Sequence, residues 1–170
     1  MIRALRESDL PAFLDLRAEA LVAEPLAFTS SPEDDTASTL PSLRQQLMRI
    51  PDWMLFVAVE DEQMVGSVGI VRRHHRKAAH KMNVWGMYVS PTHRGRGIAT
   101  ALLQAAIDHA RSVREISSIE LGVTASASTA KRLYERAGFR TWGTEPDALR
   151  FDGVSVTEYH MSLRFETHTT

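Results

Sequence analysis

The feature of this sequence that most constrains the fold is an apolar strand that runs through a short basic loop into an amphipathic helix. The apolar segment 84–89 ends at Ser90 and Pro91, and the glycine-bearing loop 94–97 follows. Such a loop predicts an anion site, because the first helical N–H groups lack intrahelical partners and the helix dipole is positive there. The apolar residues of the helix recur at helical spacing: Ile98, Leu102, Leu103, Ala106, Ile107, Ala110 and Val113.

The loop has the residue types that a phosphate group needs. Gly95 and Gly97 lack the Cβ atoms that would hold a pyrophosphate away from the backbone. Arg94 and Arg96 add charge that phosphate oxygens can use. A dinucleotide-binding loop is the alternative, but the Gly-x-Gly-x-x-Gly pattern has Thr100 at its last position. The preceding strands are also typical of hairpins rather than of βαβ units.

Two blocks of the sequence carry a resemblance to a known family. Arg94, Gly97 and Ala99 match an Arg/Gln-x-x-Gly-x-Gly/Ala pattern, and residues 130–139 read Ala-Lys-Arg-Leu-Tyr-Glu-Arg-Ala-Gly-Phe. In this order, with a helix and a strand between them, the blocks resemble the GNAT superfamily of N-acetyltransferases. The resemblance implies that the loop binds acetyl-coenzyme A (acetyl-CoA). It also implies direct transfer of the acetyl group to a primary amine of a small molecule, a protein N-terminus or a lysine.

The periodicities predict strands and helices along the whole chain. Strands are expected at 2–5, 53–59, 64–71, 82–89, 118–123, 139–143, 148–151 and 154–163, and helices at 10–21, 40–50, 98–113 and 128–137. This order, which the resemblance also implies, indicates a mixed α/β fold. We expect a mostly antiparallel central sheet of about seven strands with a single parallel βαβ crossover, flanked by about four helices. One domain over residues 1–170 is expected, with a disordered tail at about 166–170.

The composition excludes several classes of function. The chain is 44% hydrophobic and 24% charged, which is ordinary for a soluble globular protein. A formal net charge of -1 gives no reason to expect a nucleic-acid or membrane partner. Because the chain has no cysteine, thiolate metal sites and a cysteine nucleophile are excluded. We expect a cytoplasmic protein that uses no metal and exists as a monomer or homodimer.

The resemblance also implies roles for particular residues. Tyr134 matches a family tyrosine near the coenzyme A sulfur, and as general acid it would protonate the departing thiolate. Backbone N–H groups at Met87 and Val89 would bind the acetyl carbonyl and the pantetheine arm. The full set of expected cofactor-binding positions is Met87, Tyr88, Val89, Arg94, Gly95, Arg96, Gly97, Ile98, Ala99, Thr100, Ala127 and Ser128.

Two positions depart from the family pattern. Ala127 stands where many members have asparagine, although the neighbouring Ser128 offers a hydroxyl. Asn83 stands where some members have a glutamate base, and as a candidate catalytic residue it can at most hold a water that relays a proton. The other candidate bases, each of which also has a plain structural interpretation, are Glu24, His80, Glu158 and His160.

The acceptor amine is the least determined part of the prediction. The candidate groove residues are Glu24, Phe28, Trp85 and Tyr159, from segments that flank the acceptor in the family. The basic run 72–77 is interpreted as a solvated loop rather than a nucleic-acid or metal site. Because of Asn83 and Ala127, the alternative function is a non-catalytic module that binds acyl-CoA as a sensor or interaction domain.

Overall fold

The structure is a computed structural model that describes residues 1–35 and 38–165. The expected disordered tail at 166–170 lies outside these residues. The strands are β1 (Ile2–Ala4), β2 (Trp53–Glu60), β3 (Gln63–Arg72), β4 (Lys81–Val89), β5 (Ser118–Thr124), β6 (Arg140–Phe151) and β7 (Val154–Arg164). The α-helices are α1 (Leu10–Ala23), α2 (Leu40–Leu47), α3 (Ile98–Ser112) and α4 (Ser128–Arg136). Short 3-10 turns lie at Glu7–Asp9, Arg76–Ala78 and Pro91–His93.

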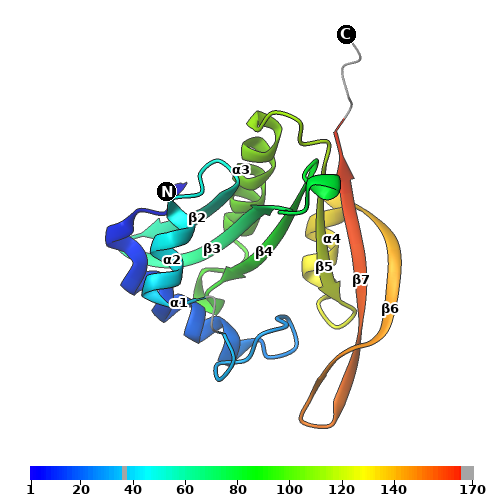
Figure 1. Cartoon of the computed structure of the whole chain (residues 1–170). Helices are drawn as coiled ribbons and strands as arrows, with labels where there is room; N and C mark the ends of the chain where they lie inside the picture. The colour runs from blue at the N-terminus through cyan, green and yellow to red at the C-terminus, as the bar shows by residue number, and fades with distance from the viewer. Residues whose placement is uncertain (36–37, 166–170) are drawn as a thin grey trace.

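The strands form a seven-stranded sheet in the order β1-β2-β3-β4-β5-β7-β6 (Figure 1). The pair β4 and β5 is parallel, and each other neighbouring pair is antiparallel. A parallel pair needs a long connection, which α3 provides here. The expected mixed α/β fold with a single parallel crossover is therefore confirmed.

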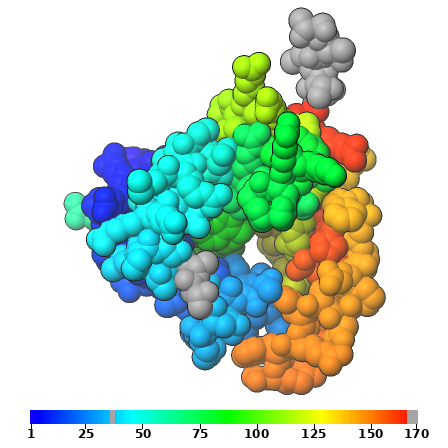
Figure 2. All heavy atoms as spheres, in the orientation of Figure 1, coloured from blue at the N-terminus to red at the C-terminus, as the bar shows by residue number. Residues whose placement is uncertain are grey.

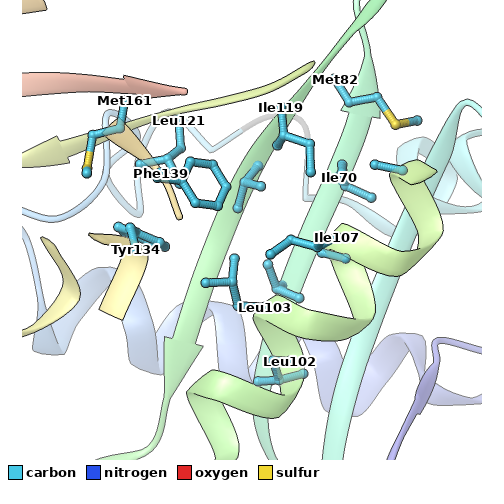
Figure 3. Close-up of a cluster of buried hydrophobic side chains, with 14 of the residues drawn as sticks. Ile70, Met82, Leu102, Leu103, Ile107, Ile119, Leu121, Tyr134, Phe139 and Met161 are labelled. Carbon is cyan, nitrogen blue, oxygen red and sulfur yellow. The ribbon is translucent and has the colours of Figure 1, made fainter. Parts of the chain in front are cut away.

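The helices cover both faces of the sheet, with α1 and α2 on one face and α3 and α4 on the other (Figure 1). Strand residues alternate between these faces, as the pleat requires. Trp53, Leu55 and Val57 of β2 pack with residues of α1 and α2. On the opposite face, the larger hydrophobic cluster brings α3 side chains such as Leu103 and Ile107 against the sheet (Figure 3). The core therefore lies in two layers, one on each side of the sheet.

The C-terminal hairpin differs from the prediction in one respect. The two short strands expected at 139–143 and 148–151 are a single strand, β6. Its pairing with β7 shifts register between Glu145 and Leu149, where Pro146 has no N–H to donate to the ladder. The turn expected at Asp152 and Gly153 is confirmed, and both residues have positive φ, 48° and 76°, as a two-residue hairpin turn requires.

The described part of the chain contains no helix long and apolar enough to cross a membrane.

Candidate functional site

The site begins where the two parallel strands part. β4 and β5 pair from Lys81–Ser118 to Asn83–Glu120, and no further pairs join them although both strands continue. Figure 1 shows the two strands diverging beyond this point, and Figure 2 shows a hollow between the two parts of the molecule. One side of the second half of β4 is therefore left without a partner strand.

A β-bulge in β4 accompanies the divergence. Ser67 of β3 pairs with Tyr88 and Gly69 pairs with Trp85, so β4 has one residue more than β3 over this stretch. Gly86 lies in the bulge with a φ of 59°, a conformation that favours glycine. The Ser67 hydroxyl donates a hydrogen bond of 3.1 Å to the Gly86 carbonyl. The bulge bends β4 at the position where its expected cofactor-binding residues begin.

These β4 residues are held firmly. Met87 lines a cavity between the diverging strands, which is described below, whereas Tyr88 and Val89 are buried. The Tyr88 hydroxyl donates to Glu19 of α1 at 2.9 Å. Burial and the neighbouring Glu19 raise the pKa of Tyr88 to about 12. The Tyr88 side chain is thus a structural anchor, and only its backbone is left for a ligand.

The glycine loop leads into α3 as the sequence predicts. Gly95 and Gly97 have φ values of 78° and 80°, and a Cβ at either position would meet nothing within 4 Å. The carbonyl of Gly97 accepts from the Ala101 N–H at 3.0 Å, which starts the helical ladder. The N–H groups of Ile98, Ala99 and Thr100 precede that first bond and have no intrahelical acceptor. Together, the loop and helix start present an open set of donors.

The two loop arginines have partners within the protein. Arg94 donates from Nε to the Val89 carbonyl at 2.9 Å and forms an ion pair of 2.9 Å with Glu24. Arg96 lies 3.3 Å from Glu60, and it is more exposed than Arg94. Arg94 therefore fastens the loop to β4. Glu24, expected in the acceptor groove, lies instead against the loop, because α1 ends beside Arg94.

A cavity of about 450 Å³ opens at the divergence of the strands. Phe28 and Trp85 line it, as expected of groove residues, whereas Tyr159 does not and contacts Lys131 of α4 instead. The cavity is assembled from α1, α2, the segment after α1, strands β2 to β5, α4 and β7. Its principal lining side chains are Arg17, Phe28, Asp35, Arg49, Trp53, Trp85, Met87, Tyr134 and Glu158.

One wall of the cavity contains an ion pair that the sequence did not reveal. Arg17 and Asp35 lie 2.9 Å apart, and their side chains are only 10% and 9% exposed. Burial opposes ionisation of Asp35, but hydrogen bonds from Arg17 and nearby serines outweigh it and lower the pKa of this carboxyl. The Arg17 guanidinium also lies 4.9 Å from the centre of the Phe28 ring. The pair fixes the segment after α1 over the cavity.

Tyr134 reaches the cavity from α4. Its ring is 5% exposed and packs edge-on against Phe139 at 5.9 Å (Figure 3). Burial raises the pKa of Tyr134 to about 12, with no contribution from a charged neighbour. The phenol therefore stays protonated at neutral pH, so it has a proton that it can donate to a group in the cavity.

Asn83 lies outside the cavity lining, so its expected catalytic role finds no support in its position. Its side-chain oxygen accepts from Arg73 at 3.3 Å. Arg73 also pairs with Glu120, which in turn accepts from Lys81 at 2.6 Å. Burial opposes ionisation of Glu120, but Lys81 and Arg73 lower its pKa. Asn83 thus belongs to a structural network where β4 and β5 are still paired.

Ala127 and Ser128 lie at the start of α4. The Ala127 N–H donates to the Thr124 carbonyl at 2.9 Å, and its own carbonyl accepts from Lys131. The basic run 72–77 forms a surface connection with a 3-10 turn, as expected of a loop. His80, one of the candidate bases, also lies outside the cavity lining.

A comparison with protein families decides the affiliation of the chain. Residues 14–139 match the family model described as "Acetyltransferase (GNAT) family". This chain belongs to the GNAT family. The matched region begins within α1 and ends just after α4, and it contains the loop, the diverging strands and Tyr134.

Individual GNAT relatives support this affiliation. Over 104 residues the chain is 35% identical to the N-acetylaspartate synthetase of Homo sapiens, covering 61% of this chain and 33% of that protein. The chain thus spans about a third of the length of the N-acetylaspartate synthetases that it matches. The ribosomal-protein-alanine N-acetyltransferase of Brucella melitensis is 27% identical with a TM-score of 0.81, covering 97% of this chain and 99% of that chain.

A further solved structure, of a putative acetyltransferase, contains acetyl-CoA as its cofactor. The yncA protein of Salmonella typhimurium, solved with acetyl-CoA, has a TM-score of 0.84 at 22% identity and covers 100% of this chain and 96% of its own. At this identity the likeness shows the shared fold.

The GNAT pattern alone did not identify every residue of the site. Glu158 lines the same cavity as Tyr134, yet in the sequence it is one of four weak candidates for a base. Within the described ranges, Glu158, Glu145 and His160 form a group whose ligand-type atoms lie within 4.8 Å of one another. Their proximity depends on the β6–β7 register, which short-range sequence patterns do not contain.

Proposed function

We propose that this GNAT chain transfers an acetyl group from acetyl-CoA to a primary amine by direct attack, with Tyr134 as the general acid. The observation that carries this proposal is the position of Tyr134, whose ring lines the cavity where β4 and β5 diverge. The glycine loop and the start of α3 follow directly after β4, and Met87 near the end of β4 lines the cavity. This is the arrangement that a long phosphate-bearing acyl donor requires.

The residues of the loop fit a pyrophosphate. The open surface at Gly95 and Gly97 lets phosphate oxygens approach the backbone, and the unpaired N–H groups of 98–100 can donate to them. Arg96, the more exposed of the two arginines, can turn from Glu60 to a phosphate. We assign to Arg94 the task of holding the loop, because its guanidinium already contacts Val89 and Glu24.

The residues around the divergence fit the acyl end of the donor. The bulged strand from Met87 to Val89 has an unpartnered side, and its N–H groups can bind the acetyl carbonyl and the pantetheine arm. Tyr134, neutral and buried, can give its phenolic proton to the departing thiolate sulfur. Asn83 is left out of this mechanism, because its amide faces Arg73 rather than the cavity.

The acceptor is a primary amine of a small molecule, a protein N-terminus or a lysine. Phe28 and Trp85 give the cavity aromatic walls, and it also contains groups of both charge signs, such as Arg49 and Glu158. The relatives' names suggest which amines to try first: aspartate and a peptide with an N-terminal alanine.

The first experiment is calorimetric titration of the purified chain with acetyl-CoA. We expect the Arg94→Ala/Arg96→Ala variant to bind about tenfold or more weakly, since each lost charge-assisted contact or loop anchor costs on the order of 1.5–3 kcal/mol. The matched control is Arg114→Ala/Arg150→Ala, which removes the same charge from exposed positions away from the loop. Equal affinity in both variants would contradict the placement of the donor.

The second experiment measures thiol release with the amine panel. Tyr134→Phe keeps the buried ring and removes only the hydroxyl, so we expect kcat to fall by about 100-fold or more while acetyl-CoA affinity stays within about twofold. Unchanged turnover in this variant would refute the acid role. Binding of acetyl-CoA without turnover of any amine would instead favour the non-catalytic module.

A further inference from the structure

We propose that Glu158 is the general base of this site and that His160 and Glu145 form a relay that carries its proton to solvent. The inference rests on the proposed function and adds to it the group that removes the proton from the acceptor amine. Among the candidate bases, Glu24 contacts Arg94 on the loop and His80 lies outside the cavity lining. Two carboxylates, Asp35 and Glu158, line the cavity together with Tyr134. Asp35 is held in its ion pair with Arg17, whereas Glu158 lies 3.7 Å from His160, so Glu158 is the carboxylate that we assign as the base.

The position of Glu158 depends on a glycine in the neighbouring strand. Glu158 of β7 pairs with Thr124 of β5, and its carboxyl group leans over Gly122, two residues away on the same face. A Cβ at Gly122 would come within 2.5 Å of the Glu158 carboxyl carbon. The missing side chain therefore creates the space that lets the carboxylate extend into the cavity. Tyr134 enters the same cavity from the α4 side of the sheet, so acid and base flank the space between them.

The surroundings of Glu158 favour its action as a base. Its side chain is 21% exposed, and burial raises the pKa of this carboxyl. Of the neighbouring charged groups, His160 on β7 acts in the opposite direction and Glu145 on β6 adds to the rise. The cavity that Glu158 enters also contains Tyr134 and the charged side chains of Arg17, Asp35 and Arg49. The facing residues of β5, Gly122 and Thr124, carry no charge. A carboxylate with a raised pKa holds an abstracted proton more strongly than an exposed one does.

A path for the proton leads away from the cavity. His160 Nδ1 lies 3.7 Å from Glu158 Oε1, and His160 Nε2 lies 2.8 Å from Glu145 Oε2. The first distance exceeds a hydrogen bond, so transfer there needs a small rotation of the carboxylate or one water molecule. Glu145 is 56% exposed and ends the path in solvent. Trp142 stacks on the His160 ring at 5.4 Å and keeps the imidazole between the two carboxylates.

The proposed steps balance as follows. The acceptor ammonium gives one proton to Glu158, and His160 and Glu145 pass it to solvent. The free amine nitrogen then forms a bond to the thioester carbonyl carbon, and the carbon–sulfur bond breaks. The thiolate takes the Tyr134 proton, and the second proton on the nitrogen passes through Glu158 to restore the phenol. The products are the amide, the free thiol and one proton, so no further reactant is needed.

The test compares the full chain with its Glu158→Gln variant, which keeps the shape of the side chain. We expect kcat/KM for the amine at pH 7 to fall by about 100-fold or more. We also expect the fall in rate at acid pH to disappear and acetyl-CoA affinity to stay within about twofold. The matched control is Glu7→Gln, whose side chain is 68% exposed and pairs with Arg44 on the surface. A Glu158→Gln variant with wild-type kcat/KM would overturn the proposal.

A second pair of variants keeps the test decisive if Glu158→Gln does not fold. Gly122→Ala leaves every titratable group in place but displaces the carboxylate, so we expect at least a tenfold loss in kcat/KM. His160→Gln should shift the acid limb of the pH profile without removing the base. Loss of activity on chelation and its return with added zinc would overturn the relay, because the three residues would then be metal ligands. Failure of the wild-type chain to acetylate any amine would refute the proposed function itself.

Discussion

Gly69 in the middle of β3 is the position where a single methyl group should disturb both stability and the acceptor cavity. The indole of Trp85, directly opposite on β4, lies over this glycine. A Cβ at Gly69 would come within 2.5 Å of the indole Cζ2 and still closer to Nε1 and Cε2. We therefore consider the Gly69→Ala variant, in which the ring must move.

The size of the effect follows from these distances. Carbon atoms make ordinary contact at about 3.5 Å or more, so the indole has to shift by roughly 1 Å or more. Trp53 lies on one side of the ring, with the centroids 5.9 Å apart, which limits movement in that direction. Such overpacking lowers the free energy of unfolding by about 1–3 kcal/mol. This loss exceeds the gain of about 0.4–1 kcal/mol expected when alanine replaces a glycine whose backbone conformation is not strained. For a chain of this size, a loss of about 1–2 kcal/mol corresponds to a Tm decrease of roughly 2–8 °C.

The assay combines thermal unfolding with steady-state kinetics. Because Trp85 lines the cavity, its displacement should raise KM for the amine severalfold while leaving acetyl-CoA affinity within about twofold. The matched control for stability is Gly143→Ala, where a Cβ would meet His160 at an ordinary 3.7 Å. If Gly69→Ala kept the wild-type Tm and amine KM, the indole would be free to move and the reasoning would be refuted.

Two further perturbations test the energetics of the core. Asp35→Asn should destabilise the chain by about 3–5 kcal/mol at pH 7, because it leaves Arg17 nearly buried without its partner. Since the pKa of Asp35 is lowered in the folded chain, the stability that its ionised carboxylate contributes is present at neutral pH and is lost as the pH falls below about 4. Urea unfolding should therefore show that the difference in unfolding free energy between the variant and the wild type becomes smaller below this pH. Leu102→Ala removes a fully buried α3 side chain and should cost about 2–5 kcal/mol, against a near-neutral Gln104→Ala control; a loss under about 1 kcal/mol would mean that the site repacks.

The part of the site that could be predicted from sequence is the part that is local in the chain. Gly95, Gly97 and the start of α3 follow from a loop and a helix period within a few residues of one another. The sequence did not reveal the contact of Glu24 with Arg94, because the two residues lie 70 positions apart and their contact depends on how α1 crosses the sheet. Gly69 shows the same limit. In the sequence, a glycine at this position only weakens the prediction of a strand. Its structural role, which is to leave room for the Trp85 indole, becomes visible only when β4 is placed beside β3.

Glu158 shows why a base was harder to predict than an acid. Tyr134 belongs to a ten-residue block with a recognisable pattern, whereas the value of Glu158 depends on three strands at once. It needs the β5–β7 register, the missing side chain at Gly122 and the β6 partner of His160. Each of these is a long-range relation, and in the sequence the residue stands in an ordinary alternating strand.

The sheet topology explains why acid, base and acyl donor should meet where they do. Each of the two parallel strands also has an antiparallel partner on its other side. β4 runs along β3, and β5 runs along β7. The bulge at Gly86 bends β4, and the backbone pairing of β4 with β5 ends at Asn83 and Glu120. Ligands of open α/β sheets bind at the point where neighbouring strands diverge. The gap between β4 and β5 is therefore a consequence of the strand order. The chemistry of the site depends on the side chains that reach this gap, which are Tyr134 from one face of the sheet and Glu158 from the other.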